Sequence, residues 1–420
     1  MAVIRDMAIF VSEYHKGNMR ALIRLLLSFD NLMITIATCI AALLLYVVPQ
    51  NFDFLSPLSQ ALGDVDLTDI VLSQLRGDDH VDVDTSIVLV NIGNGDRAQI
   101  AEQLRNISRF EPAAVGLDAF FLAQKDVELD SALARALAAT PNLVMVSRLE
   151  ADDDGTSFHD LVRSRPEFGH SAYTGFANLV TEEEKDVKTC REVSFEEKVD
   201  GRTEPSFPIA LATIVAPDKA RTALAREQTT ETINFRGNLG SFYHIDVEQS
   251  LDPGADLSVV KGKVVLMGFL GDYIGEKSVE DKFFTPMNEQ YVGRSLPDMY
   301  GVVIHANVLS MILSGEYIAT ATFAQNLLLG MCVLVLNVLT FTYIYTRYEA
   351  WYDTLALAIQ LVESLAIFYG TIVLFDDYHV KINPTPALLG VFLVGTVHDL
   401  YQDSLKKIIL RTFRKKRAEQ

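Results

Sequence analysis

Polar side chains suited to binding a ligand follow three apolar runs of the chain. Asn91 and Asn94 follow the first run, Asp118 ends the second, and Asp272 follows the third. If these runs are parallel strands of one sheet, their carboxyl ends meet at one edge, which is where ligands bind to open α/β sheets. We therefore expect amide and carboxylate groups to form a ligand-binding site at this edge.

Four more polar side chains are expected at the same edge: Asp281, Thr285, His305 and Asn307. Structural alternatives compete with the ligand-binding role. Asp118 also suits the cap of a neighbouring helix, and Asp281 with Thr285 suits a turn held by side-chain bonds to the backbone. His305 lies in an apolar segment, where a histidine of the core competes with a ligand-binding or pH-sensing residue.

The chain lacks common catalytic motifs. It has no G-x-S-x-G and no H-E-x-x-H sequence. Its GNG and GFLG runs do not complete the G-x-G-x-x-G motif, so they suit tight turns as well as a phosphate-binding loop. Asp118, Asp281, Asp298 and His305 are ligand types for a divalent ion, but scattered acids are common in an acidic chain. We expect no enzymatic activity, no metal site and no cofactor.

The elements that position these residues predict an α/β domain. Nearly continuous apolar runs rich in β-branched residues are typical of strands buried on both faces, and they alternate with segments of helical periodicity, which indicates a mostly parallel sheet with flanking helices. Segment 150–205 is polar, and we expect it to be an irregular insertion or flap. The expected strands are 86–92, 113–121, 142–149, 232–237, 242–247 and 261–271, and the expected helices are 96–110, 126–140, 205–216 and 301–316.

Four further apolar runs predict membrane-spanning helices at 31–48, 323–345, 353–375 and 384–401. A bilayer core requires about 20 residues of helix. The third run contains one mid-span carboxylate, Glu363, and a charge in the middle of a span is costly. Glu363 is expected either to hydrogen-bond a neighbouring helix, through Asn337 or Tyr343, or to join a proton pathway with His398 and Asp399.

The charges at the two ends of the chain predict its orientation. Basic residues outnumber acidic ones in segment 1–30 and in the tail 402–420, so the positive-inside rule places both termini in the cytoplasm. Residues 49–322 then form an exported domain. Because the whole chain has a net charge of −19 and its ends are basic, the exported domain is strongly acidic and should repel nucleic acid. The basic tail suits anionic lipid headgroups.

The chain has only three cysteines, which limits disulfide formation. Cys39 and Cys332 fall within predicted spans, and Cys190 stands alone in the predicted exported domain. We expect no disulfide within that domain, although an oxidising compartment would permit one. Cys190 is expected to be a free thiol on a polar loop or to pair between chains.

Five short motifs, in order, resemble those of the CHASE2 family, whose members are extracytoplasmic sensory domains of bacterial receptors. The matching motifs are a GxDxxF strand end, a PSxxxA helix, a GKxVxxG strand, a D-x-x-x-TP turn and a GVxxHAN helix. The resemblance covers about residues 30–375 and includes the layout of one span before the domain and three after it. The motif residues are Gly116, Asp118, Phe121; Pro205, Ser206, Ala210; Gly262, Lys263, Val265, Gly268; Asp281, Thr285, Pro286; and Gly301, Val302, His305, Ala306, Asn307.

This resemblance implies a sensor in the cytoplasmic membrane of a bacterium. The chain departs from the family pattern at Gly93, where the first strand is usually followed by an acid, and it carries no kinase, cyclase or GGDEF-type segment. We therefore expect a receptor that binds an extracytoplasmic ligand or protein, forms a homo-oligomer and relays its state to a separate cytoplasmic or membrane partner. The alternative is a scaffold subunit of a membrane complex that senses nothing.

Overall fold

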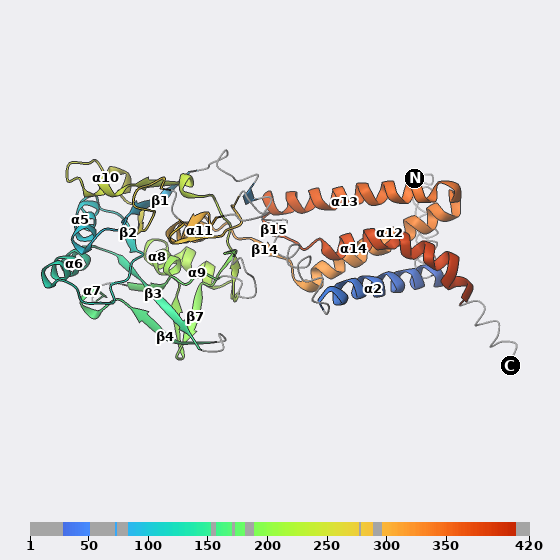
Figure 1. Ribbon diagram of the computed structural model, residues 1–420, viewed down its shortest axis with the longest axis horizontal. Coiled ribbons are helices and arrows are strands. Elements are labelled where there is room, and N and C mark those ends of the chain that lie inside the picture. Colours follow the sequence, from blue (N-terminus) through green and yellow to red (C-terminus); the bar gives the residue numbers. More distant parts are fainter. Residues whose placement is uncertain are drawn as a thin grey trace, which may run out of the picture. The chain divides into compact units, whose positions relative to one another are not determined.

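The computed structural model describes residues 28–50, 72–73, 83–152, 157–169, 173–180, 189–276, 279–288 and 296–408. The chain divides into two compact units (Figure 1). Asp64–Ala319 form one, which we call the α/β unit. Met1–Gly63 and Thr320–Gln420 form the other, which we call the helical unit. Most of segment 1–30 and of the basic tail lies outside the described residues.

Parallel strands form the centre of the sheet in the α/β unit. They run in the order β10, β1, β11, β2, β3, and β5 also pairs in parallel with β3. Met267 of β11 is in register with Val90 on one side and Leu117 on the other, so the carboxyl ends of three strands lie level. The bounds are β1 Asp84–Asn91, β2 Ala114–Leu117, β3 Leu143–Ala151, β5 Tyr173–Phe176, β10 Phe242–Ile245 and β11 Val264–Gly268.

Helices cover both faces of this sheet (Figure 1). On one face, α5 (Arg97–Ser108) and α6 (Val127–Ala139) pack on alternate strand residues such as Val90 and Leu117. On the other face lie α8 (Phe207–Val215) and α11 (Gly301–Ser314). This is the expected α/β class. The remaining helices of the unit are α7 Pro166–Gly169, α9 Pro217–Leu224 and α10 Val247–Leu251, with 3₁₀ turns at Leu239–Ser241 and Ser258–Val260.

Local sequence sets where the helices start and how closely they approach the sheet. Asp96 caps α5, where its side chain accepts from Gln99 N–H and the Gln99 side chain accepts from Asp96 N–H, which is a capping box. Gly116 lets α8 approach β2, because a Cβ there would lie 2.7 Å from Cζ of Phe207 and 2.9 Å from a methyl group of Leu211. These two features set where α5 begins and how closely α8 packs on β2.

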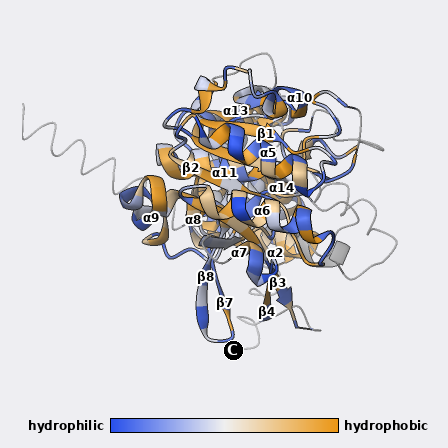
Figure 2. Ribbon diagram, turned by 90° about the vertical axis from the view of Figure 1, so that its left-hand side faces the viewer, coloured by the Kyte–Doolittle hydropathy of each residue, from blue (hydrophilic) through white to orange (hydrophobic). Residues whose placement is uncertain are grey.

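Segment 150–205 is more regular than predicted. It contains β4 (Phe158–Arg163), which pairs antiparallel with β3, followed by β7 (Glu196–Val199) and β8 (Arg202–Pro205), which extend the sheet to its edge. Figure 2 shows hydrophilic residues along the β7–β8 hairpin. A strand that is only partly buried does not need a continuous apolar sequence. The polar composition therefore wrongly predicted irregular structure here.

The expected strand 232–237 is also wrong beyond its first residue. Only Glu231–Thr232 pair as a strand, β9, with β6 (Glu192–Val193). Further along, the amide groups of Arg236 and Gly237 donate to Oδ1 of Asn307, at 2.8 and 3.3 Å. A buried side chain therefore satisfies the backbone that a strand ladder would have satisfied. Short pairs also join β12 (Lys282–Phe283) to β13 (Met299–Tyr300).

The helical unit consists of α2 (Phe29–Gln50), α12 (Phe323–Arg347), α13 (Tyr352–Asp376) and α14 (Thr385–Leu400). A π-helical turn, Tyr401–Leu405, continues α14. At one end, Asp30 of α2 accepts a hydrogen bond of 2.7 Å from the Tyr401 hydroxyl and pairs with Lys406 at 2.5 Å. Polar contacts therefore hold α2 against the end of α14.

Two helices among the described residues are long and apolar enough to cross a membrane. They are Phe323–Arg347 and Glu349–Asp376, the latter being α13 with the 3₁₀ turn before it. The described apolar part of α2, Phe29–Leu45, and α14, with 16 residues, are shorter than the ~20 residues that a span requires. Spans at 31–48 and 384–401 therefore stay a prediction.

Candidate functional site

A cleft of about 360 Å³ opens at the carboxyl ends of β2 and β5, beside the middle of β3 and the start of α11. Three of the residues predicted to bind a ligand meet there: Asp118, Asp281 and His305. Its volume is within the usual range for small-molecule sites. The other lining residues are Phe120, Ser147, Arg148, Ala177, Asn178, Leu179, Phe283 and Gly301.

Asp118 follows directly on the last residue of β2. Its amide donates to the carbonyl of Met267 at 2.8 Å, which continues the ladder with β11 and fixes the residue at the sheet edge. Among the described residues no hydrogen bond to its carboxyl group occurs, so it caps no helix there. Burial, followed by the nearby charge of Asp281, raises the pKa of Asp118 to about 7.

Asp281 reaches the cleft from the segment between β11 and β13. Its φ of 54° is left-handed, a conformation that aspartate tolerates better than most residues. Its carbonyl accepts from the amide of Gly301 at 3.2 Å, which ties the residue to the first turn of α11. Burial, then the charge of Glu280, raises the pKa of Asp281. The cleft thus holds two carboxyl groups that disfavour each other's ionisation.

His305 is 3 % exposed, one turn into α11. Its ring meets the ring of Phe207 edge-on at 5.4 Å, and one ring nitrogen donates to the carbonyl of Ala177. Burial lowers the pKa of His305 to about 4, so the imidazole is neutral at pH 7. Its Nδ1 has no hydrogen-bond partner among the described residues. A neutral ring that donates through one nitrogen offers the other as an acceptor.

Asn91 does not line the cleft but holds the neighbouring loops together. Its amide donates to Oδ1 of Asp246 and to the carbonyl of Gly271, both at 2.9 Å, and its Oδ1 accepts from the amides of Gly93 and Leu270. These four bonds use the capacity of the buried side chain. The predicted ligand-binding role of Asn91 gives way to a structural one.

Asn94 and Asp272 contact each other rather than the cleft. The amide of Asn94 donates to a carboxylate oxygen of Asp272 at 2.5 Å on an exposed part of the surface. The two residues do come together at the carboxyl edge of the sheet, because Asn94 follows β1 and Asp272 follows β11. They lie outside the lining of the cleft.

Thr285 and Asn307 are buried and bonded within the protein. The amide and hydroxyl groups of Thr285 donate to the carboxylate of Asp298, at 2.9 and 2.5 Å, which is the turn-building alternative. Asn307 bonds the backbone of Arg236 and Gly237, and its amide also donates to the carbonyl of Val303. Neither residue lines the cleft.

The possible divalent-ion set does not assemble. Asp298, bonded to Thr285, is outside the group formed by Asp118, Asp281 and His305. Within the ranges that the structure describes, no three His, Cys, Asp or Glu side chains are placed to share a metal ion. The geometry of the cleft therefore favours hydrogen bonds to a ligand over metal coordination.

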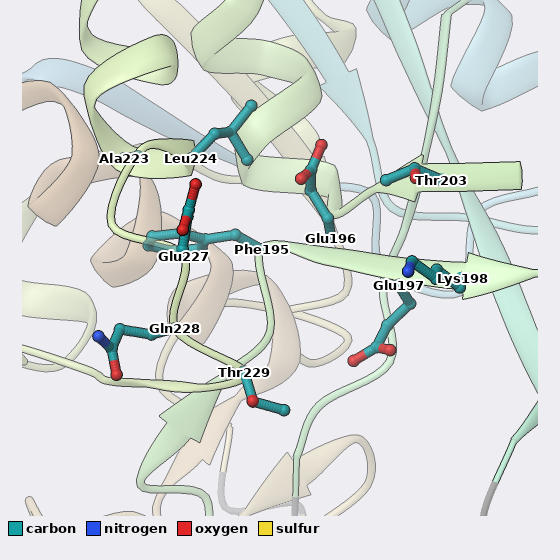
Figure 3. Close-up of a pocket in the computed structure, with 10 residues that line it drawn as sticks. All are labelled: Phe195, Glu196, Glu197, Lys198, Thr203, Ala223, Leu224, Glu227, Gln228 and Thr229. Carbon is teal, nitrogen blue, oxygen red and sulfur yellow. The ribbon is translucent and has the colours of Figure 1, made fainter.

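A second hollow, of about 490 Å³, lies between β7 and the end of α9 (Figure 3). Glu196 and Glu197 project from opposite faces of β7, as neighbours on a strand do, and Glu227 approaches from the loop after α9. These three acids are exposed or partly exposed. Because the hollow brings no buried, unpartnered polar group to its wall, we take the first cleft as the candidate site.

Glu363 lies on α13, and its Oε2 is buried without a hydrogen-bond partner among the described residues. The amide of Asn337 donates instead to Val333 in its own helix, at 3.1 Å. His398 is fully buried on α14 and contacts the hydroxyl of Tyr352 at 3.0 Å. Neither the inter-helix bond nor the proton pathway expected for Glu363 is seen in these contacts.

Several lining residues were missed because their signal in the sequence is weak. Ser147 and Arg148 lie inside a predicted strand. The alternation of side chains along a strand assigns each to a face of the sheet, but it does not indicate a binding site. Gly301 belongs to the GVxxHAN motif and Phe120 follows Asp118 by two residues, so proximity to predicted residues would have found both. Asn178 bonds the backbone of Leu149 and had no signal.

Comparison with known proteins gives one match. The model of one protein family, the CHASE2 domain, matches residues 38–340. No curated protein matches the chain significantly. No solved structure does so either.

Proposed function

Because the chain belongs to the CHASE2 domain family of extracytoplasmic sensory domains, we propose that it is a membrane receptor that binds a small molecule in the cleft at Asp118, Asp281 and His305. The observation that carries this proposal is the convergence of these three side chains around open space. Of the three, Nδ1 of His305 is buried and has no hydrogen-bond partner among the described residues, which calls for an explanation, whereas Asp118 is partly exposed and Asp281 is exposed. A bound ligand would supply the missing partners.

A non-sensing scaffold subunit would be expected to show the same three side chains buried and bonded to one another. Asn91, Asn307 and Thr285 show what such internal bonding looks like in this fold, because each is saturated by protein groups. The carboxyl groups of Asp118 and Asp281, in contrast, have no hydrogen-bond partners among the described residues. These two carboxyl groups are open to solvent and not bonded to each other, so they are available to a ligand, which supports the receptor over the scaffold.

The route of the signal is proposed to be α11. Gly301 and His305, in its first half, line the cleft, and the helix ends at Ser314. Residues 315–322 then connect it to α12, the first of the two long apolar helices after the domain. A ligand that binds one arrangement of α11 more tightly than another shifts the population of the two.

The proposed topology has four spans, α2, α12, α13 and α14, with both termini in the cytoplasm. The two long apolar helices support membrane insertion, and the excess of basic residues in 1–30 and 402–420 supports the orientation. The output is proposed to be a separate cytoplasmic protein that reads the tail or the loop after α12. The homo-oligomer and the location in a bacterial cytoplasmic membrane belong to the same proposal.

Native mass spectrometry of the full chain in mild detergent tests ligand binding. The protein is incubated with a mixture of amino acids, amines, sugars and organic acids, and bound masses are identified. We expect a bound small molecule that is lost when both Asp118→Asn and Asp281→Asn are present and retained in Asp200→Asn. Asp200 is a matched control, because it is exposed and left-handed, with φ of 47°, in the β7–β8 turn. No bound mass, or binding indifferent to the cleft changes, would favour the scaffold.

A further inference from the structure

Three hydrogen-bond acceptors meet in the cleft at Asp118, beside Ser147, Arg148 and Asn178, which carry donors. Asp118 and Asp281 bring two carboxyl groups, and Nδ1 of His305 brings a third acceptor, buried and unpartnered among the described residues. The His305 ring also interacts with the backbone of Ala177. A ligand that suits these groups must therefore donate hydrogen bonds, and it gains most if it is positively charged.

A positive charge in the wall of the cleft is already shared. Arg148 lines the cleft, but its guanidinium group pairs with Glu150 at 3.3 Å on the exposed side of β3. An anionic ligand would have to approach Asp118 and Asp281, where burial and then the charge of Asp281 already raise the pKa of Asp118. The charge distribution thus selects against carboxylates and phosphates.

Part of the wall is apolar. Phe120, Leu179 and Phe283 line the cleft, and the ring of Phe283 lies against the start of α11, 3.3 Å from where a Cβ of Gly301 would be. Aromatic faces attract organic cations, and apolar walls hold the carbon skeleton of a small molecule. A hydrated metal ion would use neither property, and it requires more oxygen ligands than two carboxyl groups supply.

We propose that the cleft binds a small organic molecule through a primary ammonium group, which donates to Asp118, Asp281 and Nδ1 of His305 while its carbon skeleton lies against Phe120, Leu179 and Phe283. An ammonium group has three donors, which match the three acceptors. This inference rests on the proposed function, since it names the ligand class of the same cleft.

Isothermal titration calorimetry near pH 8 with the full chain in detergent tests the ligand class. The probes are benzylamine, 2-phenylethylamine and putrescine, with benzyl alcohol, benzoate and Ca²⁺ as neutral, anionic and metal comparisons. We expect saturable binding of at least one amine, and a loss of roughly tenfold or more in affinity in Asp118→Asn and in Asp281→Asn, because each removes a charge-assisted hydrogen bond. Asp200→Asn should bind as the unchanged protein does.

The outcomes separate this inference from the receptor proposal. If benzoate, the alcohol or Ca²⁺ binds and depends on Asp118 while the amines do not, the ammonium assignment is wrong and the receptor stands. Amine binding that is equal in Asp118→Asn and Asp200→Asn places the amine elsewhere and overturns the assignment. If no probe binds, the ammonium assignment is overturned. The receptor proposal is then overturned as well only if native mass spectrometry with the small-molecule mixture also detects no bound mass.

Discussion

Replacing Asp118 with asparagine removes a charge that the fold holds in an unfavourable place. The carboxyl group has a pKa of 3.8 as its ordinary value and about 7 in the folded protein, because of burial and the nearby Asp281. Between these two values the folded state binds more protons than the unfolded state. The free energy of unfolding therefore falls as the pH rises from about 4 to about 7, and it stays low above that range.

The size of the effect follows from the two pKa values. Each pKa unit corresponds to about 1.4 kcal/mol, so ionised Asp118 destabilises the folded state by up to roughly 4 kcal/mol near pH 8 relative to its protonated form. Asparagine has nearly the same shape and no charge to desolvate. We expect Asp118→Asn to be more stable than the unchanged protein near pH 8, to exceed it by less than half as much near pH 5, and to differ little from it only below about pH 4.

The assay is thermal unfolding of the full chain, followed by far-ultraviolet circular dichroism at both pH values. Labelling of Cys190 by a maleimide near pH 8 assigns the transition to the α/β unit, since this thiol is fully buried and burial raises its pKa to about 12. Cys39 and Cys332 are first replaced by alanine, and Asp200→Asn is the control. An Asp118→Asn protein that is no more stable near pH 8, or that keeps the same pH dependence, would refute the reasoning.

Three further changes test the packing described above. Gly116→Ala should destabilise the α/β unit by about 1–3 kcal/mol, because its Cβ would overlap Phe207, whereas Gly240→Ala, with no atom within 4 Å, should be neutral in denaturation curves. Asn307→Ala should lower the free energy of unfolding by about 3 kcal/mol and make the labelling of Cys190 faster, because it leaves buried backbone groups without hydrogen-bond partners. Asp30→Ala should lower the aggregation temperature in detergent by releasing Tyr401 and Lys406, and an unchanged value would contradict their role in holding α2.

Apolar patterning was enough to predict the centre of the sheet. β1, β3 and β11 are buried on both faces, so their sequences are continuous apolar runs with a signal that does not depend on neighbours. The strands β4 and β7, towards one edge of the sheet, are partly exposed and polar, and their pairing depends on contacts with distant residues. Sequence composition therefore predicted the first group and missed the second.

The candidate site was predicted in part for the same kind of reason. The topology rule located Asp118 at a strand end, and the motif order added Asp281 and His305, which do line one cleft. Asn91 and Asn307 were expected to bind a ligand, but they bond the backbone of loops distant in sequence. An amide side chain has the same appearance in a sequence whether its partner is a ligand or a buried carbonyl, so only the fold distinguishes the two roles.

Cys190 shows how burial changes a chemical expectation. Its polar neighbours predicted a thiol on a loop that is open to pairing with another chain. In the structure it is 0 % exposed, and its amide donates to the carbonyl of Phe284 at 2.8 Å. A disulfide between chains through this residue would require the surrounding loops to open.

Crosslinking mass spectrometry on the full chain in mild detergent, with its associated proteins left untargeted, tests the central claim that the chain is a receptor with a separate output. Lys406 and Lys407, beyond the end of α14, offer reactive amines on the side proposed to face the cytoplasm. The account predicts crosslinks from these lysines to a defined cytoplasmic enzyme. Crosslinks only between copies of the chain, or only to other membrane subunits, would contradict it and favour a scaffold.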